Sequence, residues 1–149
     1  RALSAGHRPV DPLSRRMSGP RSGAAIAAAA RALVGVPFRL QGRDPALGLD
    51  CVGLVGAAMR AAGYAPMVPG DYGLRFGDDR RADDWARAAG LQPVKAGAVG
   101  DMMLVRPGAL HRHLLILVPG GFVHAHAGLR RVVETPGVPP WPILRIWRA

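Results

Sequence analysis

The 149-residue sequence contains a single cysteine, Cys51, and a single lysine, Lys95. One thiol excludes an internal disulfide framework and any zinc or iron–sulfur site built from several cysteines, because such sites need thiolates in pairs or fours. The hydrophobic runs fall short of the roughly 18 residues that a bilayer-spanning helix requires, so we expect no membrane segment. Cys51 is therefore either a packing residue or a nucleophile.

Aromatic residues are also few, with three Phe, three Trp and two Tyr. They are not interleaved with a basic stripe, and no zinc-finger or helix-turn-helix spacing occurs, so we expect no nucleic-acid partner. Acidic residues are scarce too, with 10 Asp and Glu against 20 Lys and Arg, a net charge of +10. A GC-rich genome, which encodes arginine where others encode lysine, explains the ratio of Arg to Lys. It does not explain the excess of positive charge, which favours an anionic partner such as a cell-wall polymer or an acidic protein surface.

The composition is that of a globular protein with one domain. Hydrophobic residues make up 49% and charged residues 20%, with a mean hydropathy of +0.11, which excludes disorder for most of the chain.

Residues 1–16 carry four arginines and two prolines and show no periodic pattern of apolar residues, so we predict a flexible basic leader. Because Met17 follows directly and could be the first residue of the protein, we interpret this leader as a translation start assigned too early. Residues 17–149 then form a single domain. Arg31 interrupts an alanine-rich stretch, so no secretory signal is recognised and we expect cytoplasmic synthesis.

Helical patterns occupy the first half of the sequence. We predict a short helix over residues 24–36, a largely buried helix over residues 51–63, and a surface helix over residues 78–90. Asp50 is a good N-cap for the second helix, and Gly63 is a good residue for its C-terminal stop.

Strand-like runs, broken by Pro-Gly and Gly-Gly signals, occupy the second half. We predict strands over residues 102–106, 113–118, 121–125, 130–134 and 142–147. Because helices precede strands and the connections have hairpin length, the fold class is α+β, with an antiparallel sheet packed on helices.

Four of the five histidines fall within sixteen residues, as the pairs His111/His113 and His124/His126. Each pair lies on one face of its strand, because side chains alternate with period two. In a hairpin, one loop register sets His113 opposite His124, and a tighter Pro-Gly turn sets it opposite His126. Either register gives a cross-strand imidazole pair.

Cys51 is predicted to begin a helix, where free backbone N–H groups and the positive end of the helix dipole stabilise a thiolate. A helix-start thiol and paired imidazoles match the needs of nucleophilic catalysis, in which one base takes the thiol proton and a further polar group orients that base. The same residues are also a mixed nitrogen and sulfur set for zinc. Only Asp101 and Glu134 are near enough in the strand half to orient such ligands, so we favour a site without metal or other cofactor and keep a His/Cys metal-binding protein as an alternative.

Five segments, in order, resemble the NlpC/P60 family of cysteine peptidases, particularly its short variety associated with phage tails and gene transfer agents. Residues 35–42 (GVPFRLQG) are similar to the family's G-x-P-Y-x-x-G-G segment, and residues 49–55 (LDCVGLV) are similar to its D-C-S-G-L helix start. Residues 100–104 (GDMML) are similar to G-D-L, residues 113–118 (HLLILV) to H-V-G-I-Y, and residues 122–125 (FVHA) to F-I-H-A.

The resemblance implies a papain-like NlpC/P60 fold in which the nucleophile helix packs on a small antiparallel sheet. It implies Cys51 as the nucleophile, His113 as the general base and then acid, and His124 as the orienting residue. It decides for His124 over His126, because His124 stands in the matching F-x-H-A segment. It also places Asp50 at the substrate subsite, as a residue that binds a peptide amine.

The implied substrate is the peptide stem of bacterial peptidoglycan, typically at a γ-D-glutamyl to diamino-acid bond. The phage-tail likeness further implies partners among the proteins of a tail-like particle, so that the chain is made in the cytoplasm, packaged, and acts in the periplasm or cell wall.

The sequence departs from the family pattern at two positions assigned to substrate binding. Phe38 stands where the family usually has Tyr, and Val52 stands where it usually has Ser, so two polar groups beside the thiol are missing. These departures favour an alternative, a non-catalytic tail or wall-binding module with the same fold. His111 and His126 are additional to the family pattern, and we expect them at the rim of the site.

Overall fold

The computed structural model of the chain describes residues 21–68 and 79–149. The leader expected over residues 1–16, Met17 and the start of the helix predicted from Asp78 lie outside the described residues. The elements, in chain order, are α1 (Gly23–Ala32), β1 (Arg43–Asp44), β2 (Gly48–Leu49), α2 (Cys51–Ala61), α3 (Asp79–Ala88), β3 (Gln92–Pro93), β4 (Met102–Gly108), β5 (His111–Val118), β6 (Gly121–His126), β7 (Arg131–Pro136) and β8 (Ile143–Arg148).

Within these described ranges the strands form an antiparallel six-stranded sheet in the order β3-β8-β4-β5-β6-β7, and β1 pairs with β2 in a separate two-stranded sheet. The α+β class and the antiparallel sheet predicted from the sequence are confirmed. The five longer strands match the predicted runs, whereas β1, β2 and β3 were not predicted, because two-residue strands are too short to show an alternating pattern.

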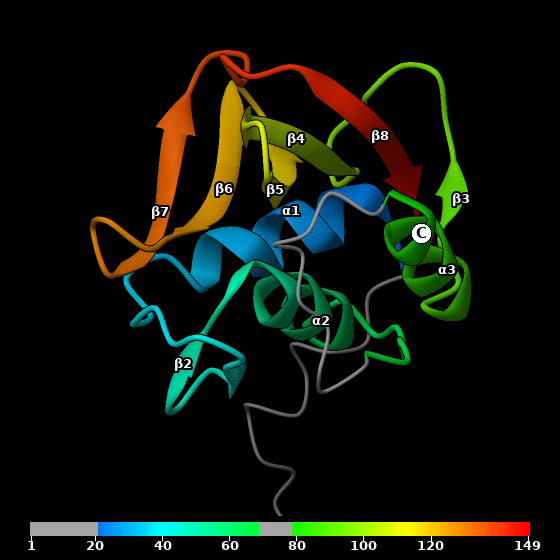
Figure 1. The fold of residues 1–149 in the computed structure, drawn as a ribbon. Coiled ribbons are helices and arrows are strands. Elements are labelled where there is room, and N and C mark those ends of the chain that lie inside the picture. Colours follow the sequence, from blue (N-terminus) through cyan, green and yellow to red (C-terminus); the bar gives the residue numbers. More distant parts are fainter. Residues whose placement is uncertain (1–20, 69–78) are drawn as a thin grey trace, which may run out of the picture.

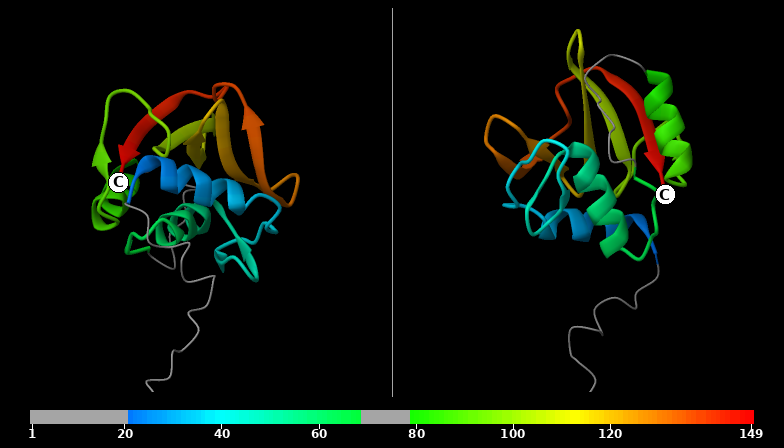
Figure 2. Two further views of the ribbon diagram at one scale, coloured as in Figure 1. Left: turned by 180° about the vertical axis from the view of Figure 1, so that it is seen from behind. Right: turned by 60° about the horizontal axis from the view of Figure 1, so that its bottom comes forward.

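Helices α1 and α2 lie side by side against one face of the sheet (Figures 1 and 2). The core between them contains alternate residues of the central strands, including Leu104, Leu114, Ile116 and Val123, each fully buried. The residues that alternate with these along the strands point to the other face of the sheet, where they form a second cluster with Met103, Val105, Leu115 and Phe122. Both faces are thus covered, so the strands read as nearly continuous hydrophobic runs rather than alternating ones.

Helix α3 packs near the edge of the sheet that β3 and β8 form (Figure 1). Its Trp85, which is buried, meets Trp147 of β8 edge to face with ring centroids 6.3 Å apart. The Arg145 guanidinium of β8 forms an ion pair with Asp83 at 3.0 Å. The apolar face of α3, with Trp85, thus anchors to the sheet the segment that was predicted as a surface helix.

Helix α1 is shorter than the prediction of residues 24–36. It begins after Ser22, whose hydroxyl accepts the Ala25 N–H at 3.1 Å, and it ends at Ala32. Beyond that point the backbone pairs with β7: the Val132 N–H donates to the Val36 carbonyl at 2.8 Å. Sheet hydrogen bonds thus replace the last helical ones, which the alanine-rich sequence could not reveal.

Candidate active site

Helix α2 begins at Cys51, as the sequence predicted, and Asp50 is its N-cap. The Asp50 backbone is extended, with φ of −94°, and its carboxylate accepts the Gly53 N–H at 2.8 Å. A Cβ added at Gly53 would collide with the carbonyl oxygen of Gly42. Glycine at this position therefore lets the segment before β1 lie directly on the first turn of α2.

The Cys51 sulfur lies where α2 meets β5. The backbone N–H groups of Leu114 and Val52 are near enough to it to lower the pKa of the thiol, and Leu114 directly follows His113. Among the described residues, the sulfur and the His113 ring share no hydrogen bond. The structure thus brings the thiol to the backbone of β5 beside His113.

The pKa of the Cys51 thiol rises from 9.0 to about 12, chiefly because the surrounding protein withdraws the thiol from water, although the residue as a whole is half-buried. The Asp50 charge contributes to this rise, while the backbone N–H groups of Leu114 and Val52 and the Arg43 guanidinium oppose it. The sequence predicted that the helix start would stabilise a thiolate. Here the loss of solvation outweighs the backbone donors, so the resting group at neutral pH is the protonated thiol.

His113 and His124 are in direct contact. The His113 Nε2 lies 2.9 Å from His124 Nδ1, and the His124 Nε2 lies 3.3 Å from Thr135 Oγ1. The three side chains form a hydrogen-bonded row across β5, β6 and β7. The β5–β6 pairing joins Val118 to Gly121, which is the tighter of the two predicted registers, and the His113 ring reaches diagonally to His124.

Only one assignment of donors and acceptors along this row leaves His113 with a nitrogen that can accept a proton. If His113 Nε2–H donates to His124 Nδ1, then His124 Nε2–H must donate to the Thr135 hydroxyl oxygen, and His113 Nδ1 is left as an acceptor. In the described part of the chain, Nδ1 of His113 makes no hydrogen bond. This is the nitrogen that can take up a proton.

Both imidazoles are neutral at pH 7. Burial, and then the charges of the neighbouring histidines, lower the pKa of His113 from 6.5 to about 3. Burial, followed by the charge of His126, lowers the pKa of His124 to about 4. Close imidazoles that are shielded from water accept positive charge poorly, so His113 stays unprotonated, with a free lone pair, over most of the pH range.

Aromatic rings cover the histidine pair. Trp141 lies edge-on to His113 and His124, with ring centroids 6.1 and 5.9 Å away, and Phe122 lies 5.1 Å from His124. Sequence reasoning missed both Trp141 and Thr135, because neither stands in a motif with the histidines. Only the pairing of β6 with β7 and the return of the chain toward β8 bring them to the site.

The two additional histidines flank the row. His111 is exposed and His126 is half-buried, in line with the expectation that they lie at the rim. The His126 Nδ1 accepts the Leu129 N–H at 3.0 Å, which holds the turn between β6 and β7.

The residues assigned to substrate binding take different places. Val52 is 1% exposed and lies in the core, so it would meet a substrate only if the surrounding chain moved. Phe38 is half-buried, and its N–H donates to the Arg130 carbonyl at 2.9 Å. Asp50 is buried and forms an ion pair with Arg43 at 2.6 Å. Substrate contact by these three residues stays a prediction.

In residues 21–68 and 79–149, no three His, Cys, Asp or Glu side chains are grouped so that they could hold a metal ion. The helices of the same ranges include none with the length and apolar character needed to cross a membrane.

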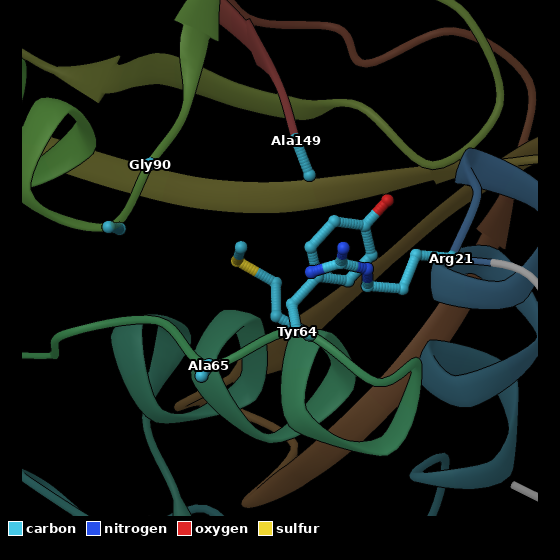
Figure 3. A pocket seen from close by; sticks show the side chains of 7 residues that line it. Arg21, Tyr64, Ala65, Gly90 and Ala149 are labelled. Atoms are coloured by element: carbon cyan, nitrogen blue, oxygen red, sulfur yellow. The ribbon is translucent and has the colours of Figure 1, made fainter.

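A hollow of about 550 Å³ lies near the C-terminal end of α2, away from Cys51 at the helix start (Figure 3). Its walls include Met59, Tyr64 and Arg21. The guanidinium of Arg21 lies 5.6 Å from the centre of the Tyr64 ring. None of the predicted site residues lines this hollow.

No protein-family model and no curated protein sequence matches the chain. The fold, however, is similar to solved structures. The chain is 25% identical to the NlpC/P60 domain of the peptidoglycan hydrolase SagA, with a TM-score of 0.54 over 77% of this chain and 89% of that one.

Two mycobacterial structures are also similar. The P60 domain of antigen MAP1204 from M. avium subspecies paratuberculosis is 18% identical, with a TM-score of 0.55 over 83% of this chain and 90% of that one. The peptidoglycan hydrolase RipB from Mycobacterium tuberculosis is 22% identical, with a TM-score of 0.56 over 98% of this chain and 73% of that one. The chain therefore has the NlpC/P60 fold that its sequence resemblance implied.

Proposed function

We propose that this protein is a peptidoglycan hydrolase of the NlpC/P60 type, a cysteine peptidase that cleaves the peptide stems of the bacterial cell wall. One observation carries the proposal: Cys51 begins α2 where that helix packs on β5, near enough to the Leu114 backbone for it to lower the pKa of the thiol, and the residue before Leu114, His113, is hydrogen-bonded to His124 at 2.9 Å. The fold shared with NlpC/P60 domains of named peptidoglycan hydrolases supports it.

Acylation begins with Cys51 and His113. The Cys51 sulfur attacks an amide carbonyl carbon of the stem peptide while its proton passes to His113 Nδ1, so that an S–C bond forms and the carbonyl oxygen becomes an oxyanion. Backbone N–H groups at the start of α2 stabilise that oxyanion. The proton on His113 then passes to the leaving nitrogen as the C–N bond breaks, which releases the amine and leaves a thioester.

Deacylation uses the same base. Water attacks the thioester while His113 takes up its proton, the S–C bond breaks, and the proton returns to the sulfur. The products are a carboxylic acid and an amine. His124 holds the His113 ring through Nε2, and Thr135 holds His124 in turn, so both are positioning residues in this scheme.

The pKa values of Cys51 and His113 indicate that both side chains are uncharged before the reaction begins. With the pKa of Cys51 raised to about 12 and that of His113 lowered to about 3, a thiol and a neutral imidazole are the resting forms, rather than a thiolate and an imidazolium. The proton then moves as the S–C bond forms, which makes His113 a general base in the strict sense.

The net charge of +10 agrees with a polyanionic wall as the place of action. Three finer predictions remain: that the scissile bond joins a γ-D-glutamyl to a diamino-acid residue, that the chain travels on a phage-tail-like particle, and that it acts in the periplasm or wall after synthesis in the cytoplasm. Mass spectrometry of the released peptides tests the first, and mass spectrometry of purified particles tests the other two.

Clearing of purified sacculi tests the hydrolase itself. We expect the wild-type protein to solubilise sacculi, and Cys51→Ser and His113→Gln to lose at least a hundredfold of that activity with an unchanged melting temperature. If the wild type and Cys51→Ser clear equally little while both bind sacculi, the non-catalytic wall-binding module replaces the peptidase.

A further inference from the structure

An ion pair that the family resemblance did not imply lies next to the candidate nucleophile. The Nη1 of Arg43, on β1, lies 2.6 Å from Oδ1 of Asp50, the residue before Cys51. The Arg43 side chain is 22% exposed and the Asp50 side chain 11% exposed. The pair is thus largely withdrawn from water, where a charge-assisted hydrogen bond of this length is strong.

The Asp50 carboxylate is already occupied on both oxygens. Its Oδ1 accepts the Gly53 N–H at 2.8 Å as well as the Arg43 guanidinium, and its Oδ2 accepts the Gln41 N–H at 3.0 Å. These donors come from α2, from β1 and from the segment between α1 and β1. An ammonium group seeking this carboxylate would have to displace one of them and would meet the guanidinium at close range.

The guanidinium is held in place by the fold. Its Nη1 also donates to the Gly42 carbonyl at 3.1 Å, and Arg43 pairs with Leu49 across the β1–β2 ladder. The close approach of Gly42 to Gly53 presses this segment onto the first turn of α2. The charge of Arg43 is therefore held in a fixed place beside the start of α2.

Both charges act on the sulfur: Asp50 raises the pKa of the Cys51 thiol and Arg43 lowers it. A group bound beside the sulfur likewise meets a carboxylate that a guanidinium partly offsets, rather than a lone anion.

We infer that Arg43 is a specificity-determining residue, which neutralises Asp50 so that the site beside Cys51 accepts stem peptides whose N-terminus is amide-linked, as in the intact wall, in preference to released peptides with a free ammonium. This inference rests on the proposed function. It replaces the expectation that Asp50 binds a peptide amine.

The test compares two synthetic stem peptides, L-Ala–γ-D-Glu–diaminopimelate with a free amine and its N-acetyl form. We expect the wild type to cleave the N-acetyl peptide with kcat/KM at least equal to that for the free amine. Arg43→Gln leaves Asp50 uncompensated and should shift the ratio of the two kcat/KM values at least tenfold toward the free amine, while Arg43→Lys, which keeps the charge, should retain most of the wild-type ratio.

Arg87→Gln is a matched control. It removes the same charge from α3, where Arg87 is 79% exposed in an ion pair with Asp84, and it should leave the ratio unchanged. If Arg43→Gln melts too early to assay, Asp50→Asn serves instead. Asparagine preserves the helix cap, and it should disfavour the free amine by a further threefold or more because the guanidinium then lacks its counter-charge.

Binding separates this inference from the proposed function. Calorimetry with Cys51→Ala, alone and combined with Arg43→Gln, gives the ratio of Kd values for the two peptides whether or not the wild type cleaves them. If the wild type cleaves neither the peptides nor sacculi, the proposed function alone is refuted. A wild-type preference of tenfold for the free amine, a ratio unmoved by Arg43→Gln, or no binding of either peptide would overturn the inference.

Discussion

The protonation state of Cys51 leads to the most direct test of the site. A rise of the pKa from 9.0 to about 12 lowers the fraction of thiolate at neutral pH about a thousandfold, since each pH unit changes the ratio of the two forms tenfold. Iodoacetamide reacts with the thiolate. We therefore expect the folded protein to be alkylated on the order of a thousandfold more slowly than an ordinary thiol at pH 7, with a rate that rises about tenfold per pH unit up to pH 10.

Cys51 is the only cysteine, so intact-mass spectrometry reports its alkylation without ambiguity. The same chain unfolded in urea is the internal reference, because its thiol is solvated and its pKa returns to the ordinary range. We expect the His113→Gln variant to follow the wild-type profile, because a neutral imidazole does not stabilise a thiolate.

A different profile would refute this reasoning. If the folded protein reacts between pH 6 and pH 8 as fast as the unfolded chain, and His113→Gln removes that reactivity, then Cys51 and His113 form a thiolate–imidazolium pair at rest. The general-base scheme would then be wrong, although the peptidase itself would stand.

Three further predictions follow from particular contacts. Gly53→Ala places a Cβ against the Gly42 carbonyl oxygen and should lower stability by about 1–3 kcal/mol, whereas Gly108→Ala, whose nearest neighbour would lie 3.8 Å away, should leave the melting temperature unchanged. Thr135→Val removes the partner of His124 Nε2 and should lower kcat about tenfold with KM constant, an effect of about 1.4 kcal/mol. Thr135→Ser keeps the hydroxyl and should retain the wild-type kcat. An equal fall of kcat in both variants would show that the hydroxyl of Thr135 does not position His124. A chelator should change neither activity nor melting temperature, and a fall of several degrees would instead support the metal-binding alternative.

Local patterns in the sequence predicted much of the fold. The cap at Asp50 acts three residues along the chain, and the strand runs around the histidines depend on period two, so both could be recognised from neighbouring residues alone. The order of helices and strands indicated the α+β class for the same reason. The end of α1 was predicted four residues too late, because its last turn gives way to hydrogen bonds with Val132, about one hundred residues away in the sequence.

Tertiary contacts decided what the site can do. The guanidinium of Arg43 on Asp50, the hydroxyl of Thr135 behind His124 and the indole of Trp141 over the histidines all come from segments without a shared motif. The pKa of Cys51 shows the difference most clearly: its place at a helix start was visible in the sequence, but the burial that keeps the thiol protonated exists only once α2 packs against β5. Solvation depends on every neighbour in space, and the sequence by itself names only the neighbours along the chain.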